Sequence, residues 1–272
     1  MRGTSLASYE SVASAFEGVL AGAGQEARTL GEQLFSVVDA LDASGSLRRA
    51  LGDPSRGADD KARLASTLLS GKVDDRVVEV VQGLARSRWT AEVDLTTAAE
   101  RLASQAYLAA AQSDGSLEQV EDELFRLERV LVGNRELRQA LRERRASPAN
   151  RRALVVDLLG AGRVHPVTLE LVSRSVGTPR ERSVVAALAE LGRLAAERRS
   201  MLVADVTAAV PLSLEQEDRL VQILQRLYGR PVTVNIAVDP AVVGGISVRV
   251  GDDLVDSTVV ARLDEVRRRL AG

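Results

Sequence analysis

The chain has 272 residues, 45% hydrophobic and 27% charged, a composition typical of a globular protein with two or three modest domains. A net charge of −2 gives no general attraction to nucleic acid or to an anionic membrane surface. The absence of cysteine excludes disulfides, zinc–thiolate sites and thiol nucleophiles, and the single histidine cannot form a multi-histidine metal site.

The N-terminal region and the hydropathy pattern give no sign of membrane targeting. Charged residues occur early, at Arg2, Glu10 and Glu17, unlike a signal peptide. No run reaches the ~18 apolar residues of a membrane span. We therefore expect a cytosolic protein without direct membrane insertion, whose association with a membrane would be indirect.

The first two-thirds of the chain has the periodicity of amphipathic helices. A helix is predicted over residues 5–21, and its apolar face is formed by Val12, Phe16, Val19 and Leu20. A second helix follows, and glycines and a proline near residues 45, 52–54 and 71 separate shorter segments.

This pattern recurs about 90 residues later in the same helical phase. Leu34-Phe35 corresponds to Leu124-Phe125, and Leu47-Arg48 corresponds to Leu137-Arg138. Two copies are too few for a solenoid, so the sequence predicts two tandem helical bundles, residues 1–100 and 101–200. They meet around residues 91–112, where one helix can end the first bundle and open the second.

Beyond Ser200 the period changes from helix to strand. Apolar residues alternate after Met201, and Ser213 with Gln216 forms a capping box that begins a helix. Further alternation predicts three more strands, and a last helix would bury Val259, Leu263, Val266 and Leu270. Residues 201–272 are therefore predicted to be a small α+β module at the end of a mainly α chain.

A search for chemistry finds no catalytic, cofactor-binding or metal-binding residue. Gly244-Gly245 is not followed by the Lys-Ser or Lys-Thr of a phosphate loop, and it favours a close backbone approach or a bulge instead. Asp252-Asp253 is typical of a turn. No histidine or lysine is placed as a base, and Trp89 is interpreted as an anchor of the bundle.

Residues 239–252 read Asp-Pro-Ala-Val-Val-Gly-Gly-Ile-Ser-Val-Arg-Val-Gly-Asp and resemble the signature of the delta/OSCP family of F-type ATP synthases. Asp256-Ser257-Thr258-Val259 replaces the Asp-Gly-Ser-Val of the family pattern. The duplicated bundle departs from the usual family member and resembles the extended delta subunits of actinobacteria. Within the module, the resemblance marks seven positions as stalk-binding or signature residues. They are Gly244, Gly245, Ile246, Gly251, Asp256, Arg262 and Leu263.

The resemblance implies a non-catalytic stator subunit without a cofactor. In the family, the helical domain grips amphipathic N-terminal helices of the alpha subunits of the catalytic head, with the beta subunits as an additional candidate. The C-terminal module binds the b-type stalk, so the head does not co-rotate during proton-driven ATP synthesis. The implied location is the cytoplasmic face of the cell membrane, as a peripheral part of the complex.

The two copies are expected to differ in role. Val12, Phe16, Val19 and Leu20 make a bulkier face than the corresponding Leu102, Ala106, Ala109 and Ala110. We expect the first copy to hold a helix of the head and the second to lengthen or brace the stator. The alternative functions are a generic helical adaptor, or an RNA-binding module, which would need exposed aromatic residues that the predicted strands lack.

Overall fold

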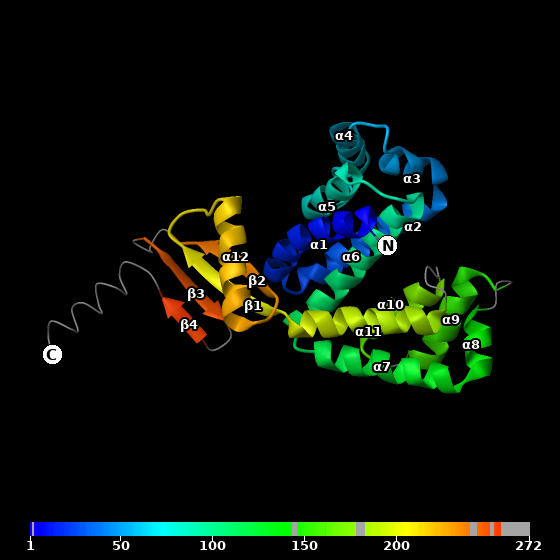
Figure 1. The fold of residues 1–272 in the computed structure, drawn as a ribbon. Helices are drawn as coiled ribbons and strands as arrows, with labels where there is room; N and C mark the ends of the chain where they lie inside the picture. The colour runs from blue at the N-terminus through cyan, green and yellow to red at the C-terminus, as the bar shows by residue number, and fades with distance from the viewer. Residues whose placement is uncertain are drawn as a thin grey trace. The chain divides into compact units, whose positions relative to one another are not determined.

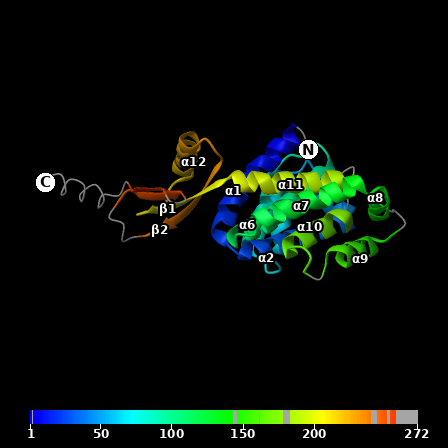
Figure 2. The same ribbon diagram turned by 90° about the horizontal axis from the view of Figure 1, so that it is seen from below.

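A computed structural model gives the structure of the chain and describes residues 1, 3–142, 146–160, 162–177, 183–239, 244–250 and 253–256. The chain divides into two compact units, Met1–Arg199 and Ser200–Gly272. The first is helical and the second contains a small sheet (Figures 1 and 2). This confirms the predicted fold class, whereas the boundary proposed near residue 100 stays a prediction.

The helices of the first unit fall into two groups that share one member. The first group, up to and including α6, is α1 Thr4–Ala23, α2 Glu26–Ala43, α3 Gly45–Gly52, α4 Ala58–Leu69, α5 Asp75–Arg86 and α6 Glu92–Ser113. After α6 come α7 Leu117–Gly133, α8 Arg135–Arg142, α9 Pro148–Leu159, α10 Pro166–Gly177 and α11 Val184–Ser200. Helices α2 to α5 thus recur as α7 to α10, about 90 residues later.

Individual hydrogen bonds repeat with the helices. Arg48 donates from Nη1 to the carbonyl oxygen of Leu41 over 2.5 Å, and Arg138 makes the same contact with Leu131. Ser44 Oγ accepts from the backbone N–H of Leu47 at the start of α3. The equivalent cap of α8 is Asn134, whose Oδ1 accepts from the N–H of Leu137. The two copies therefore share the hydrogen bonds that connect their second and third helices, with Asn134 in place of Ser44 as the cap.

A second repeated contact closes each bundle. The N–H of Asp74, before α5, donates to Gln33 Oε1 over 2.7 Å. The N–H of His165, before α10, donates to Glu123 Oε2 over 2.9 Å. In both copies a loop is tied to the second helix, and in the second copy the backbone of His165 makes that tie.

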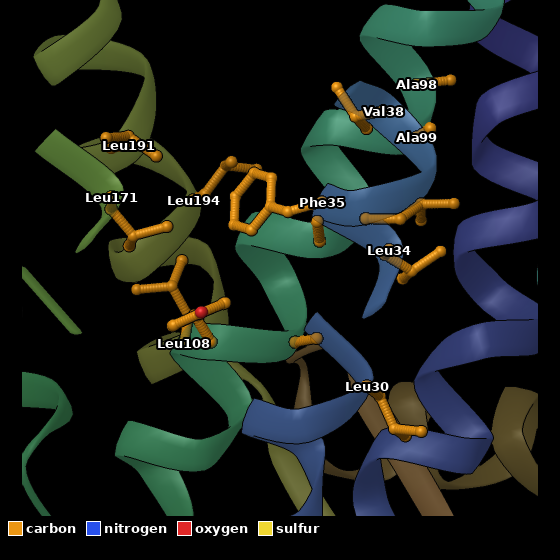
Figure 3. Packing of buried hydrophobic residues seen from close by; sticks show 14 of the residues in the cluster. Leu30, Leu34, Phe35, Val38, Ala98, Ala99, Leu108, Leu171, Leu191 and Leu194 are labelled. Carbon is orange, nitrogen blue, oxygen red and sulfur yellow. The ribbon is translucent and has the colours of Figure 1, made fainter. Parts of the chain in front are cut away.

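Helix α6 is buried because both copies pack against it. One continuous apolar core extends from α1 to α11 and includes Ala98, Leu102, Ala106 and Leu108 of α6. Figure 3 shows Phe35 of α2 pointing into this core toward Leu194 of α11. The shared helix predicted around residues 91–112 is confirmed, and because the core is continuous, the two copies form a single packed body.

Trp89 lies just before α6 and anchors this region. The residue is buried, and its indole Nε1 donates to the carbonyl oxygen of Leu84 over 2.9 Å. The prediction that Trp89 anchors the bundle is confirmed. Because it is the only tryptophan in the sequence, its fluorescence reports on the folding of the helical unit.

Gly31 lets α2 approach α6 closely, which gives a stability prediction. A Cβ on Gly31 would lie 2.6 Å from Tyr107 Cδ2 and 3.1 Å from the carbonyl oxygen of Ala103. We expect Gly31→Ala to destabilise the chain by about 1–3 kcal/mol through overpacking. Gly18→Ala is the matched control, since nothing lies near Gly18, and it should stabilise by about 0.5–1 kcal/mol. Urea unfolding followed by Trp89 fluorescence measures both, and equal effects would refute the close-approach argument.

A buried ion pair joins the first helix to the last helix of this unit. The Arg198 guanidinium of α11 binds the Glu17 carboxylate of α1 and also donates to Gln112 Oε1 over 3.1 Å. Burial raises the pKa of the Glu17 carboxyl above its usual value, although Arg198 acts in the opposite direction. Removing one partner would therefore leave an uncompensated buried charge.

Arg198→Met should cost about 3–5 kcal/mol near neutral pH, because Glu17 would be left charged and buried. Because the pKa of the Glu17 carboxyl is higher in the folded chain than in the unfolded chain, its protonation favours the folded chain. The loss of unfolding free energy in Arg198→Met should therefore shrink as the pH falls through the range in which carboxyl groups titrate. The double variant Glu17→Leu, Arg198→Met should recover most of the loss. Urea unfolding at several pH values checks this, and a loss that is independent of pH would contradict it.

In the second unit, the described strands form one sheet in the order β2-β1-β3-β4. The elements are β1 Leu202–Ala208, α12 Leu214–Tyr228, β2 Val232–Val238, β3 Ile246–Val250 and β4 Asp253–Asp256. β1 pairs in parallel with β2 and antiparallel with β3, and β3 pairs antiparallel with β4. The crossover from β1 to β2 runs through α12, as parallel neighbours require.

The start and end of α12 follow its sequence signals. The predicted capping box is present, with Ser213 Oγ accepting from the Gln216 N–H and Gln216 Oε1 accepting from the Ser213 N–H. Gly229 ends the helix in the left-handed conformation. Leu224 is buried against the sheet, with Leu220 packed beside it, while Ile223 and Leu227 are exposed. The predicted last helix lies outside the described residues.

Candidate partner-binding groove

A groove of about 330 Å³ runs between α1 and α5 of the first copy. Its apolar lining is Val12, Ala15, Phe16, Val19, Val80 and Gly83. A Cβ on Gly83 would meet Val12 at ordinary contact distance, 3.5 Å, so the glycine widens the groove without being forced by packing. A trough of this kind, floored by small and branched side chains, suits the apolar face of an amphipathic helix.

The residues predicted to bind the head are only partly brought together by this groove. Val12, Phe16 and Val19 line it, whereas Leu20 is buried in the core and is not among the lining residues. Phe16 is 1% exposed, so its ring belongs mainly to the core of the bundle. Val19 is partly exposed, and it is the predicted residue best placed to touch a ligand.

Sequence reasoning missed the contribution of α5, above all Gly83. The available signal was a glycine within the apolar pattern of a helix, because glycine destabilises a helix by about 1 kcal/mol relative to alanine. The pattern could not reveal that α5 lies beside α1, because that pairing depends on the tertiary fold.

Charged side chains surround the groove and are held by neighbours. Arg76 donates from Nε to Asp74 Oδ1 over 2.9 Å and pairs with Glu26 over 3.0 Å. The hydrogen bonds from Arg76 lower the pKa of Asp74 to about 2. Glu79 and Arg86 complete the charged rim. The rim therefore offers charges of both signs to a bound helix.

In the second copy, the corresponding face is closed among the residues that the structure describes. Leu102, Ala106, Ala109 and Ala110 are all buried within the helical unit. At the position of Gly83, α10 carries Arg174, which binds Asp39 of α2 over 2.7 Å. The face that is open in the first copy is thus used for internal packing in the second.

The signature residues of the C-terminal module are partly described. Gly244 and Gly245 precede β3 with φ of 134° and 87°, a backbone that favours glycine, while the close backbone approach or bulge expected at this pair stays a prediction. Ile246 begins β3 opposite Ala208, and Asp256 ends β4 opposite Ser247. The other predicted positions, Gly251, Arg262 and Leu263, lie outside the described residues.

No group of acidic or histidine side chains suited to a metal ion occurs among the residues that the structure describes. Within the same residues, no helix is long and apolar enough to cross a bilayer.

Comparisons with known proteins place these features in a family. The family model for the ATP synthase delta (OSCP) subunit matches residues 98–270. The chain is 55% identical to ATP synthase subunit delta of Beutenbergia cavernae over the full length of both chains. It is 44% identical to that of Streptomyces coelicolor, again over the full length of both, and 49% identical to that of Streptomyces griseus over 91% of each.

A solved structure was also found, titled as the mitochondrial ATP synthase hexamer of Toxoplasma gondii. One of its chains aligns with 62% of this chain, and 97% of its own length, at 21% identity and a TM-score of 0.27. A likeness at this TM-score has no bearing on the fold.

The chain therefore belongs to the ATP synthase delta (OSCP) family. It is a non-catalytic subunit of the peripheral stalk of ATP synthase, as the resemblance implied. The family model begins inside α6, so it covers the second helical copy and the module and leaves the first copy outside. Relatives that align over their full length share the extended form.

Proposed function

We propose that the first helical copy grips an amphipathic N-terminal helix of an alpha subunit, while the C-terminal module binds the b-type stalk. The chain then holds the catalytic head against the torque of the central shaft from the cytoplasmic face of the membrane. The observation that carries the head contact is the open apolar groove between α1 and α5. Helix-in-groove recognition needs only apolar anchors at helical spacing, and no catalytic group.

The second copy is the rival for the head contact. The match to the family model includes it and not the first copy. Its face corresponding to the groove is buried, however, so a ligand helix would have to displace α10 from its contact with Asp39. This difference in accessibility favours the first copy.

Val19 gives the sharpest test of the head contact. Val19→Ser should weaken binding of a synthetic alpha-subunit N-terminal peptide by roughly tenfold, since burying one such side chain is worth roughly 1.5–3 kcal/mol. The change should leave the fold intact because Val19 is only partly buried, unlike Phe16. Calorimetry on the intact chain measures the affinity.

Val93→Ser is the matched control for this test. Val93 is an exposed valine near the start of α6, outside the groove lining, and its substitution should leave peptide affinity unchanged. The intact chain is required because α6 completes the core of both copies, so neither copy can be cut out cleanly. Equal affinity for Val19→Ser and wild type would remove the head-binding role from the first copy.

The stalk contact rests on the C-terminal module. Its helix α12 exposes Ile223 and Leu227, one turn apart on the same face, which gives the described part of the module an apolar surface outside its own core. A small core of Ala204, Val206, Leu224, Val232, Val248 and Val250 supports that surface. These apolar residues support a contact with the helical end of a stalk subunit.

Truncation tests the stalk contact without disturbing the helical unit. A chain ending at Ser200 should lose all measurable binding to a b-subunit fragment, while Trp89 fluorescence and the melting temperature of the helical unit stay the same. The expectation follows because Met1–Arg199 is a compact unit with its own core. Retained binding by the truncated chain would disprove the assignment of the stalk contact to the module.

A further inference from the structure

Among the described strands, β2 and β4 form the two edges of the sheet in the C-terminal module. Charged residues, prolines and bulges on an edge strand oppose the addition of a further strand. β4 begins and ends with aspartate, at Asp253 and Asp256. β2 reads Val-Thr-Val-Asn-Ile-Ala-Val, without a charged residue or a proline, and it pairs with β1 residue for residue. The β2 edge therefore lacks the usual protection against strand addition.

The backbone groups that β2 leaves unpaired follow from its register with β1. Leu202 of β1 lies opposite Val232, and its N–H donates to the carbonyl oxygen of Pro231 over 2.8 Å. In a parallel ladder alternate residues bond to the same neighbour, so the odd-numbered residues of β2 bond to β1. The even-numbered residues direct their N–H and C=O groups away from β1, and within the described residues these groups have no hydrogen-bond partner. They are Val232, Val234, Ile236 and Val238.

The side chains along this edge alternate between an apolar and a polar face. Val234 and Ile236 pack against the core of the module. Asn235 lies on the opposite face, where its Nδ2 donates to Asp205 Oδ1 over 3.1 Å. Because directly opposed residues of neighbouring strands share a face, an added strand would place apolar side chains beside Val234 and Ile236 and a polar one beside Asn235.

The direction of an added strand is favoured by ladder stability, and the charge beside the edge then defines one end of it. Antiparallel pairs are slightly more stable per residue than parallel pairs, and an antiparallel strand would have its carboxyl end at the start of β2. Arg230 lies just before that start, is exposed, and has no ion-pair partner within the described residues. An acidic side chain at the carboxyl end of the added strand would complement this charge.

We propose that the stalk subunit adds an extended segment to the β2 edge as an antiparallel strand. The segment carries β-branched apolar residues at alternate positions, opposite Val234 and Ile236, and an acidic side chain beside Arg230. Main-chain hydrogen bonds supply affinity in this mode, and the alternating side chains supply specificity. The strand addition rests on the proposed stalk contact of the module. Since β2 follows α12 after one short turn, a helical part of the same partner can lie on α12.

Amide hydrogen exchange of the intact chain, followed residue by residue by NMR, tests the strand addition. In the free chain, the outward amides of Val234 and Ile236 should exchange at least about tenfold faster than those of Thr233 and Asn235, which bond to β1. Binding of the soluble part of the b-type stalk subunit should slow exchange at Val234 and Ile236 by at least about tenfold. Thr233 and Asn235 are the internal controls, because their bonds to β1 are present without the partner.

Removing the charge of Arg230 tests the direction of the added strand. Arg230→Gln should weaken binding of the stalk subunit by about two- to fivefold, the range expected for an exposed ion pair. Arg249→Gln is the matched control, because Arg249 is an exposed arginine on β3, away from the β2 edge, and its loss should leave the affinity unchanged. Equal affinities for the two variants would rule out the antiparallel direction.

The outcomes of the exchange experiment separate the strand addition from the stalk contact itself. If the stalk subunit binds while Val234 and Ile236 still exchange rapidly, the strand addition is wrong and the stalk contact stands. If the stalk subunit does not bind, both are wrong. Slow exchange at these two amides in the free chain that disappears on dilution would mean that a second copy of this chain covers the edge, and this would also overturn the proposal.

Discussion

Helix α6 belongs to both copies, and this shared helix is the constraint on which the helical unit depends. Helices of the first and second copies pack against it, so it has to be apolar on several faces and narrow where they approach. Its buried residues are accordingly rich in alanine, including Ala98, Ala99, Ala103 and Ala106. A shared helix joins two bundles without a linker, and the resulting continuous core couples them mechanically.

The shared helix also explains why two copies of one bundle have different surfaces. The first copy keeps its α1–α5 side open and covers Phe35 with the second copy. The second copy has no further repeat to cover Phe125, and Arg174, at the position of Gly83, is engaged with Asp39. Duplication of one pattern therefore yields two copies that expose different faces, the α1–α5 side in the first and Phe125 in the second.

Local signals in the sequence were enough to predict most of the fold. The repeat, the shared helix, the Ser213–Gln216 cap and the succession of strands and helix along the C-terminal module follow from local periodicity or from one periodic offset, whereas the order of the strands in the sheet depends on pairings 30 or more residues apart. Which apolar side chains stay exposed was not predictable in this way. Leu34-Phe35 and Leu124-Phe125 are identical pairs, yet Phe35 is buried and Phe125 is exposed, because burial depends on which distant helix arrives. For the same reason the predicted Val12, Phe16, Val19 and Leu20 face proved to be divided between groove and core.

A stator does no chemistry, and its task is to stay attached under a turning load. Because the helical unit has one continuous core, a head helix held in the α1–α5 groove would load the whole helical unit and not one copy of it. If the C-terminal module holds the stalk, as proposed, both contacts of the chain act within one complex. The second contact then forms as an intramolecular event, so two modest contacts can give an avidity about 10²–10⁴-fold above either alone. A single contact of the same total area would release completely each time it opened, whereas two separate contacts would lengthen the attachment without either one being exceptionally strong.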